Sequence, residues 1–134
     1  MNNTTIEQDI QAAGKTAPRV TPADIESNIV SEHYFTAGDG VIGAFAAIKF
    51  KKTSGDITLS ADIAHPDLLK DSLKLLTFCV LVLRNGFTVT GESACASPEN
   101  FDAEIGCKIA RANAVTKIWP LMGYALRNEL SKGN

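Results

Sequence analysis

The chain has 134 residues, a formal net charge of −2, and 45% hydrophobic and 21% charged residues. This length and composition are typical of one globular domain, and the charge excludes a strongly basic nucleic-acid-binding surface at the level of the whole chain. The three cysteines form no CxxC pair, which argues against a disulfide framework and a zinc ribbon. No signal peptide is recognisable in residues 1–10, and the longest apolar run, residues 75–83, is too short to span a bilayer. We therefore expect neither a membrane nor a nucleic acid as a partner.

The first half of the chain predicts a flexible N-terminal tail over residues 1–19, followed by a single α+β domain over residues 20–134. The tail is polar, and Thr21-Pro22 after it is typical of a helix start, so we expect a short helix over residues 22–30. A short strand is expected over residues 33–36. Residues 41–50 are apolar and rich in small side chains, and their pattern does not separate helix from strand.

The clearest local pattern is a β-hairpin over residues 77–93. Asn85-Gly86 separates two runs of strand-forming residues, which predicts a two-residue type I′ turn and places Val82 opposite Val89. We expect one face of this hairpin to contact the main core, and it comprises Phe78, Val80, Val82, Phe87 and Val89. The other face carries Thr88, Thr90 and Glu92, whose polar side chains are expected to line a groove.

A long helix is expected to cover this small antiparallel sheet. Ser97-Pro98 predicts its start and Pro120 its end, which gives a helix over residues 98–117 and a separate terminal helix. A stripe that includes Phe101, Ile105 and Trp119 is expected to pack on the sheet. Small residues on the opposite side allow close approach of a second backbone, either the terminal helix or another copy of the chain. We expect a homo-oligomer with an interface made by Ala103, Gly106, Ala110 and Ala114.

The second half of the chain also resembles a known protein family. Residues 76–130, with NGFTVTGESACASPENFDAEIG and KIWPL as the most specific runs, resemble a family of small tailed-phage and prophage proteins, and the resemblance extends to residues 22–41 through IESNIVSEHYFTAGDGV. It implies a phage origin, a location in the host cytoplasm, and a variable insertion near residues 42–72. It implies no catalytic residues, and it implies a basic residue at the position of Cys107.

The leading functional hypothesis is a non-enzymatic counter-defence protein that sequesters a small nucleotide-type host immune signal in pockets between subunits. Sugar or base would be bound by polar residues at the hairpin and helix start, and phosphate by a cation from the same chain or a neighbour. The expected ligand-binding residues are Thr88, Thr90, Glu92, Ser93, Asn100, Lys108 and Arg111. Alternatively, Glu92 is a solvated edge carboxylate, and Lys108 pairs with Glu104 along the helix.

No motif in the sequence indicates catalysis. There is no metal-ligand spacing and no phosphate-binding glycine loop, and Cys95 is more typical of a small buried residue than of a nucleophile. We therefore expect no catalytic residue, no metal and no cofactor. Two alternatives remain: a protein-binding inhibitor of a host defence or regulatory enzyme, or an enzyme that processes a nucleotide with Glu92 as its general base. The inhibitor would use the acidic residues 1–72, where ten acids and six bases give a net charge of −4.

Overall fold

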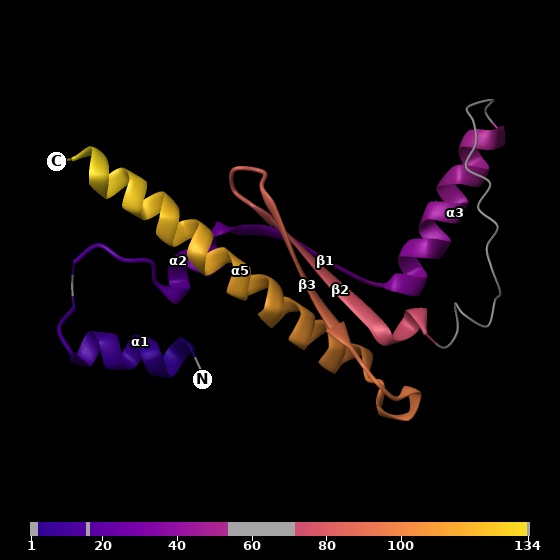
Figure 1. The fold of residues 1–134 in the computed structure, drawn as a ribbon, viewed down its shortest axis with the longest axis horizontal. Coiled ribbons are helices and arrows are strands. Elements are labelled where there is room, and N and C mark those ends of the chain that lie inside the picture. Colours follow the sequence, from indigo (N-terminus) through magenta and orange to yellow (C-terminus); the bar gives the residue numbers. More distant parts are fainter. Residues whose placement is uncertain (1–2, 16, 54–71, 134) are drawn as a thin grey trace.

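The structure is a computed structural model that describes residues 3–15, 17–53 and 72–133. These residues form helices and one antiparallel sheet, so the α+β prediction is confirmed (Figure 1). The helices are α1 (Asn3–Ala12), α2 (Pro22–Asn28), α3 (Ala37–Thr53) and α5 (Ala103–Lys132), the strands are β1 (Ile29–Thr36), β2 (Leu76–Leu83) and β3 (Thr88–Ala94), and the two short 3₁₀ turns are η1 (Leu73–Leu75) and η2 (Pro98–Asn100).

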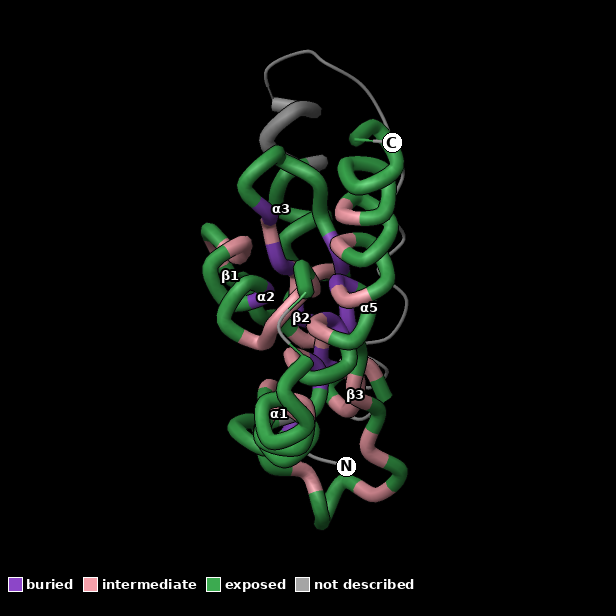
Figure 2. Tube along the Cα trace, turned by 90° about the vertical axis from the view of Figure 1, so that its left-hand side faces the viewer, coloured by how far each residue is buried: buried purple, intermediate pink, exposed green. Residues whose placement is uncertain are grey.

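The sheet has the strand order β1-β2-β3, and α5 crosses one of its two faces (Figure 1). We call the face under α5 the inner face and the opposite one the outer face. Side chains alternate along each strand. In β2 the inner positions, from Thr77 to Leu83, are buried, whereas the outer positions are only half-buried. The core therefore lies between the sheet and α5, as the burial colours of Figure 2 show.

The hairpin has a different register from the predicted one. Val89 pairs with Leu81 rather than with Val82, because the loop contains three residues, 84–86, and not two. The Leu83 N–H donates to the Phe87 carbonyl at 2.8 Å, and Gly86 adopts a positive φ of 87°, which is typical of a three-residue hairpin loop. The shift by one residue places Val89 opposite Leu81 on the inner face, where it is buried. Phe87 lies beside the loop and is exposed.

Apart from Val89 in the hairpin and Trp119 in the helix, the predicted core faces of both elements were wrong. The core contains Cys79, Leu81 and Leu83 from β2 in place of Phe78, Val80 and Val82. From α5 it contains Gly106, Ala110, Ala114 and Ile118, whereas Ile105 and Ile109 are about half exposed, at 55% and 46%. The side of the helix that was expected to bind another copy therefore packs on the sheet of its own chain.

The physical reason for this orientation is the close contact between α5 and β3. A Cβ atom at Gly91 would lie 2.1 Å from the backbone oxygen of Ala110 and 2.3 Å from the backbone nitrogen of Ala114. One at Gly106 would lie 3.0 Å from the Thr77 hydroxyl. Only a sheet face that carries Gly91 and a helix face of glycine and alanine reach this distance, so the small residues determine which faces meet.

The C-terminal helix starts later and extends further than predicted. Residues 98–100 form only the turn η2, and the carboxylate of Asp102 caps α5 by accepting the Ile105 N–H at 3.0 Å. Pro120 lies inside α5 and does not end it. Apolar side chains at four-residue spacing, Ile118, Met122 and Leu126, are buried or half-buried on both sides of the proline. Because their packing outweighs one missing hydrogen bond, the helix continues to Lys132.

The N-terminal half differs in part from its prediction. Thr21 and Asp24 cap α2 reciprocally, as the sequence predicts, with N–H to side-chain oxygen distances of 2.9 and 3.1 Å. Residues 41–50 are helical and belong to α3, which extends away from one end of the sheet (Figure 1). Residues 3–12 form α1 where a flexible tail was expected. Much of the expected insertion near residues 42–72 lies outside the described residues. None of the described helices is long and apolar enough to cross a lipid bilayer.

Candidate functional site

A cavity of about 290 Å³ lies where β3 ends and α5 begins. Its lining comes from the end of β3, the connection through η2 and the first two turns of α5. Asp102 caps the start of α5 at the cavity, and Ser93 of β3 and Asn100 of η2 both line it. Ile105 and Ile109 form its apolar wall.

Four polar side chains line this cavity, namely Thr77, Ser93, Asn100 and Asp102. Thr77 is almost completely buried, with 2% of its surface exposed, and lies opposite Ser93 in the β2–β3 pairing. The Asp102 carboxylate accepts the Ile105 N–H, whereas no hydrogen bond joins the other three side chains to a described residue. Among the described side chains no nitrogen or oxygen atom is both buried and without a partner, so a ligand with donors and acceptors would replace water at these groups. Sequence analysis overlooked Thr77 because a single threonine in an apolar strand carries no signal of its own.

The structure separates the predicted ligand-binding residues into three groups. Ser93 and Asn100 share the cavity. Thr88, Thr90 and Glu92 lie on the outer face of β3, where all three are exposed. The Thr90 hydroxyl donates to the Glu92 carboxylate at 3.4 Å, and among the described side chains it is the only one that forms a hydrogen bond with that carboxylate.

Lys108 and Arg111 form the third group, on α5 and outside the cavity lining. Lys108 is 3.5 Å from Glu104, four residues earlier, and both side chains are at least three-quarters exposed. Such a pair contributes only about 0.3–0.5 kcal/mol. The Lys108 ammonium group is therefore free to exchange Glu104 for another anion at little cost.

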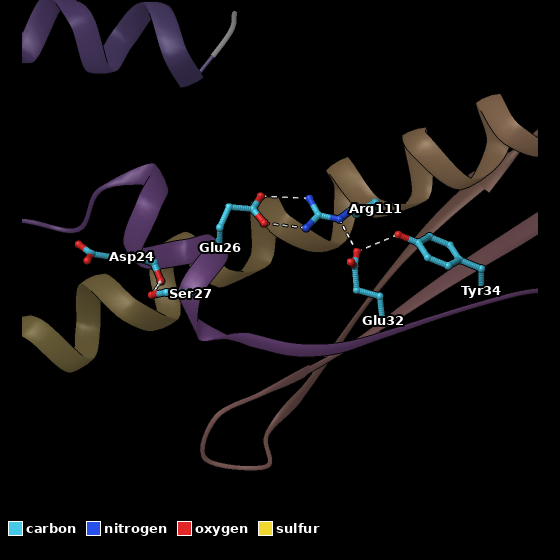
Figure 3. A network of polar contacts seen from close by, with 6 residues as sticks. All are labelled: Asp24, Glu26, Ser27, Glu32, Tyr34 and Arg111. Carbon is cyan, nitrogen blue, oxygen red and sulfur yellow. Dashed lines mark hydrogen bonds and ion pairs between the residues drawn. The ribbon is translucent and has the colours of Figure 1, made fainter.

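Arg111, in contrast, is occupied by two carboxylates of its own chain (Figure 3). Its Nη1 and Nη2 donate to Glu26 of α2 at 3.1 and 2.7 Å, and its Nε donates to Glu32 of β1. The Tyr34 hydroxyl donates to the same Glu32 carboxylate at 3.0 Å. The cluster joins α2, β1 and α5, so its first role is structural.

The charges of this cluster shift the pKa values of its members in the expected directions. The hydrogen bond from Arg111 lowers the pKa of Glu32. Burial, followed by the contact with the Glu32 carboxylate, raises the pKa of Tyr34. The hydrogen bonds to Glu26 and Glu32 raise the pKa of Arg111, which holds its positive charge firmly. Burial raises the pKa of the nearby Cys79 thiol and outweighs the opposite effects of Tyr34 and Arg111.

The remaining candidates lie apart from one another. Cys95 is half-buried at the cavity wall, and its thiol donates to the Ser97 carbonyl at 3.2 Å. Of the expected oligomer interface, Gly106, Ala110 and Ala114 are buried inside the chain, and Ala103 is exposed. No group of three or more histidine, cysteine, aspartate or glutamate side chains suited to a metal ion occurs in the described part of the chain.

Comparison with known proteins identifies the family of this chain. Neither the curated proteins nor the solved structures gave a match. A family profile, described as the phage protein (N4 Gp49/phage Sf6 gene 66) family, matches residues 20–130. This range contains the whole sheet, the cavity and nearly all of α5. The chain therefore belongs to the phage protein (N4 Gp49/phage Sf6 gene 66) family.

Proposed function

We propose that this phage protein is a counter-defence factor that binds a small nucleotide-type host immune signal and withholds it without altering it. The observation that carries the proposal is the cavity beside the start of α5, where Thr77, Ser93 and Asn100 have no hydrogen-bond partner among the described residues. Hydroxyl and amide groups of this kind complement a nucleobase or a ribose. The host cytoplasm, where such signals are made, is the location that the function requires.

The size of the cavity supports a binding site that a second copy completes. At about 290 Å³ it is near the lower limit of small-molecule pockets, enough for a base or a ribose but not for a whole nucleotide. Its apolar wall ends in Ile105 and Ile109, which are about half exposed in one chain. A homo-oligomer that buries these isoleucines would close the pocket, in place of the interface first expected at Gly106, Ala110 and Ala114.

The charges around the cavity indicate where a phosphate would bind. Among the described residues no cation lines it, Asp102 places a carboxylate in its wall, and Arg111 is neutralised by Glu26 and Glu32. Lys108 is the better candidate because its contact with Glu104 is long and exposed. In an oligomer, Lys108 of a neighbouring copy would supply the positive charge.

Calorimetry against a panel of cyclic nucleotides and ADP-ribose derivatives tests the proposal. Ser93→Ala removes one cavity hydroxyl and is expected to weaken binding by about five- to tenfold, the loss of roughly 1 kcal/mol. Thr90→Val removes a hydroxyl from the outer face and serves as the matched control with unchanged affinity. If Thr90→Val weakens binding and Ser93→Ala does not, the site lies on the outer face. An absence of binding across the whole panel refutes the proposal.

A second candidate function is inhibition of a host protein through the outer face of the sheet. This face carries Phe35 and Phe78, whose ring centroids are 5.5 Å apart, beside half-buried Val80 and Val82. An uncovered apolar sheet face is typical of a protein-binding surface. The acidic surface expected for this function is weaker than the sequence suggests, since Glu7, Glu26 and Glu32 pair with arginines of the chain.

Capture experiments from host lysate distinguish this candidate from the first. One host protein retained in stoichiometric amount by the wild type, and lost in Val80→Glu, would favour inhibition. A nucleotide-processing enzyme is the third candidate. It has the least support because Glu92 is exposed at the sheet edge, and it would require turnover that Glu92→Gln abolishes.

A further inference from the structure

The N-terminal helix α1 covers an apolar groove that lies far from the cavity of the proposed function. Val20, Pro22 and Trp119 form one side of a hollow of about 250 Å³, and Ile6 and Ile10 of α1 form the other. A second hollow of about 440 Å³ shares Arg19 and Val20 with the first. It continues between α2 and the C-terminal half of α5, along Met122, Ala125 and Leu126. The two hollows together form one groove, which α1 covers at one end.

An ion pair joins α1 to this groove. Arg19 Nη1 and Nη2 donate to the two carboxylate oxygens of Glu7 at 2.7 and 2.6 Å, and Gln11 Nε2 donates to the same carboxylate at 2.6 Å. The hydrogen bond from Arg19, with a smaller contribution from Gln11, lowers the pKa of Glu7 to about 2. A two-pronged arginine–carboxylate pair fixes direction as well as distance, so it sets how α1 lies over the groove.

Apolar packing of α1 is weak by comparison. Of its residues whose burial is described, none is buried, and Ile6 remains 36% exposed. A ten-residue helix is marginal in water when isolated, so α1 needs the groove to stay helical. Segments with few buried contacts open at low free energy while the rest of a protein stays folded. These properties describe a segment that docks and releases.

The family match divides the groove from its cover. Val20, Pro22 and Trp119 lie within residues 20–130, whereas α1 and Arg19 lie outside them. The apolar floor therefore lies within the matched range, and the helix over it lies outside that range. The composition of α1 matches the groove, because it offers two isoleucines on either side of a carboxylate to an apolar floor beside an arginine.

We propose that α1 is a releasable strap over this groove, which opens and closes while the rest of the domain stays folded. The Glu7–Arg19 pair is the latch. Helix-in-groove recognition uses apolar anchors three or four residues apart, and Ile6 and Ile10 are four residues apart. Release of α1 would uncover Val20 and Trp119 without disturbing the sheet.

Charge reversal in the full-length protein tests the latch. Glu7→Arg and Arg19→Glu each break the pair, and the double variant restores it with opposite polarity. Trp119 is the only tryptophan in the chain, so quenching of its fluorescence by acrylamide reports the covering of the groove. We expect each single variant to raise the quenching constant about twofold and to speed amide exchange in residues 3–12 about tenfold, and the double variant to return both to wild-type values.

Two controls keep the result interpretable. Asp9→Arg makes the same charge change on α1 away from Arg19 and is expected to have no effect. Slow amide exchange in β2 and α5 shows that the domain of a variant stays folded. If a charge-reversal variant loses this slow exchange, the isosteric Glu7→Gln is used in its place. Single variants that behave like the wild type would overturn the proposal, and so would a double variant that stays open.

Discussion

Gly91→Ala is the sharpest test of how α5 lies on the sheet. The added methyl group would lie 2.1 Å from the Ala110 oxygen, 2.3 Å from the Ala114 nitrogen and 2.9 Å from the Ala114 Cα. All three are backbone atoms of a helix, so none of them moves alone. To bring these contacts to an ordinary distance of about 3.4 Å, α5 must move away from β3 by roughly 1 Å or more.

The expected cost follows from this displacement. Overpacking of a close contact costs about 1–3 kcal/mol, and the displacement also loosens Ala110, Ala114 and Ile118 against the sheet. Alanine returns about 0.5–1 kcal/mol by restricting the unfolded chain. We therefore expect Gly91→Ala to lower the free energy of unfolding by about 3 kcal/mol. For a chain of this length that corresponds to a decrease in melting temperature of about 10 °C.

Urea denaturation followed by far-UV circular dichroism measures this change. Gly123→Ala is the matched control, because Gly123 lies in the same helix and an added Cβ there meets nothing within 4 Å. It is expected to raise the stability by about 0.5–1 kcal/mol, since glycine weakens a helix interior. A Gly91→Ala variant whose stability stays within about 0.5 kcal/mol of the wild type would refute the close contact of α5 with β3.

Three further predictions concern Arg111 with its two carboxylate partners and the three cysteines. Arg111→Met leaves two partly exposed carboxylates unpaired and is expected to cost about 1–2 kcal/mol in urea denaturation at neutral pH. Because Arg111 lowers the pKa of Glu32, the pair stabilises the fold above the ordinary glutamate pKa of about 4.3 and ceases to do so as pH falls through the lowered value. The stability difference between wild type and Arg111→Met should therefore shrink between about pH 5 and pH 3, and an unchanged difference would contradict the assignment. Burial raises the pKa of Cys79, so iodoacetamide labelling read by mass spectrometry should modify Cys95 and Cys107 in the folded protein and Cys79 only after unfolding.

The sequence predicted the hairpin, the long C-terminal helix and the α2 cap because each has a local chemical cause. Thr21 and Asp24 satisfy each other's backbone, and Asn85-Gly86 turns the chain whatever lies around it. The length of the turn, two residues or three, depends on finer preferences of Arg84 and Gly86 that the dipeptide does not reveal. One additional residue in the loop changes the pairing register of β2 and β3, and the register determines which side chains face the core.

The wrong helix face has a different cause. Both sides of α5 are apolar: one carries Ile105 and Ile109, and the other Gly106, Ala110 and Ala114. A hydrophobicity pattern favours the larger residues for the core, because it counts apolar surface and not the distance between backbones. Gly91 decides the matter, but it lies twelve or more residues away in the sequence, and its closeness to Ala110 emerges only in the folded chain.

For the candidate site, the sequence predicted one polar cluster at the start of the helix, but it joined residues that the sheet separates. Ser93 and Glu92 are neighbours in the chain, yet strand alternation sends Ser93 to the cavity and Glu92 to the outer face. The sequence assigned Arg111 to a phosphate because no local pattern reveals its true partners. Glu32 and Glu26 precede it by 79 and 85 residues.

The sheet and α5 both turn a different face to the core than the sequence predicts, and this affects which apolar surface stays exposed. Because the smallest residues of α5 meet the sheet, its larger ones, Ile105 and Ile109, remain exposed. The same exchange turns Phe78, Val80 and Val82 to the outer face, where they are half-buried. A domain that packs its small residues inside and leaves isoleucine and phenylalanine outside retains apolar area for association. The expectation of a homo-oligomer therefore depends on different residues and no longer on the stripe of small residues. The isoleucines that would form the contact, Ile105 and Ile109, also line the cavity.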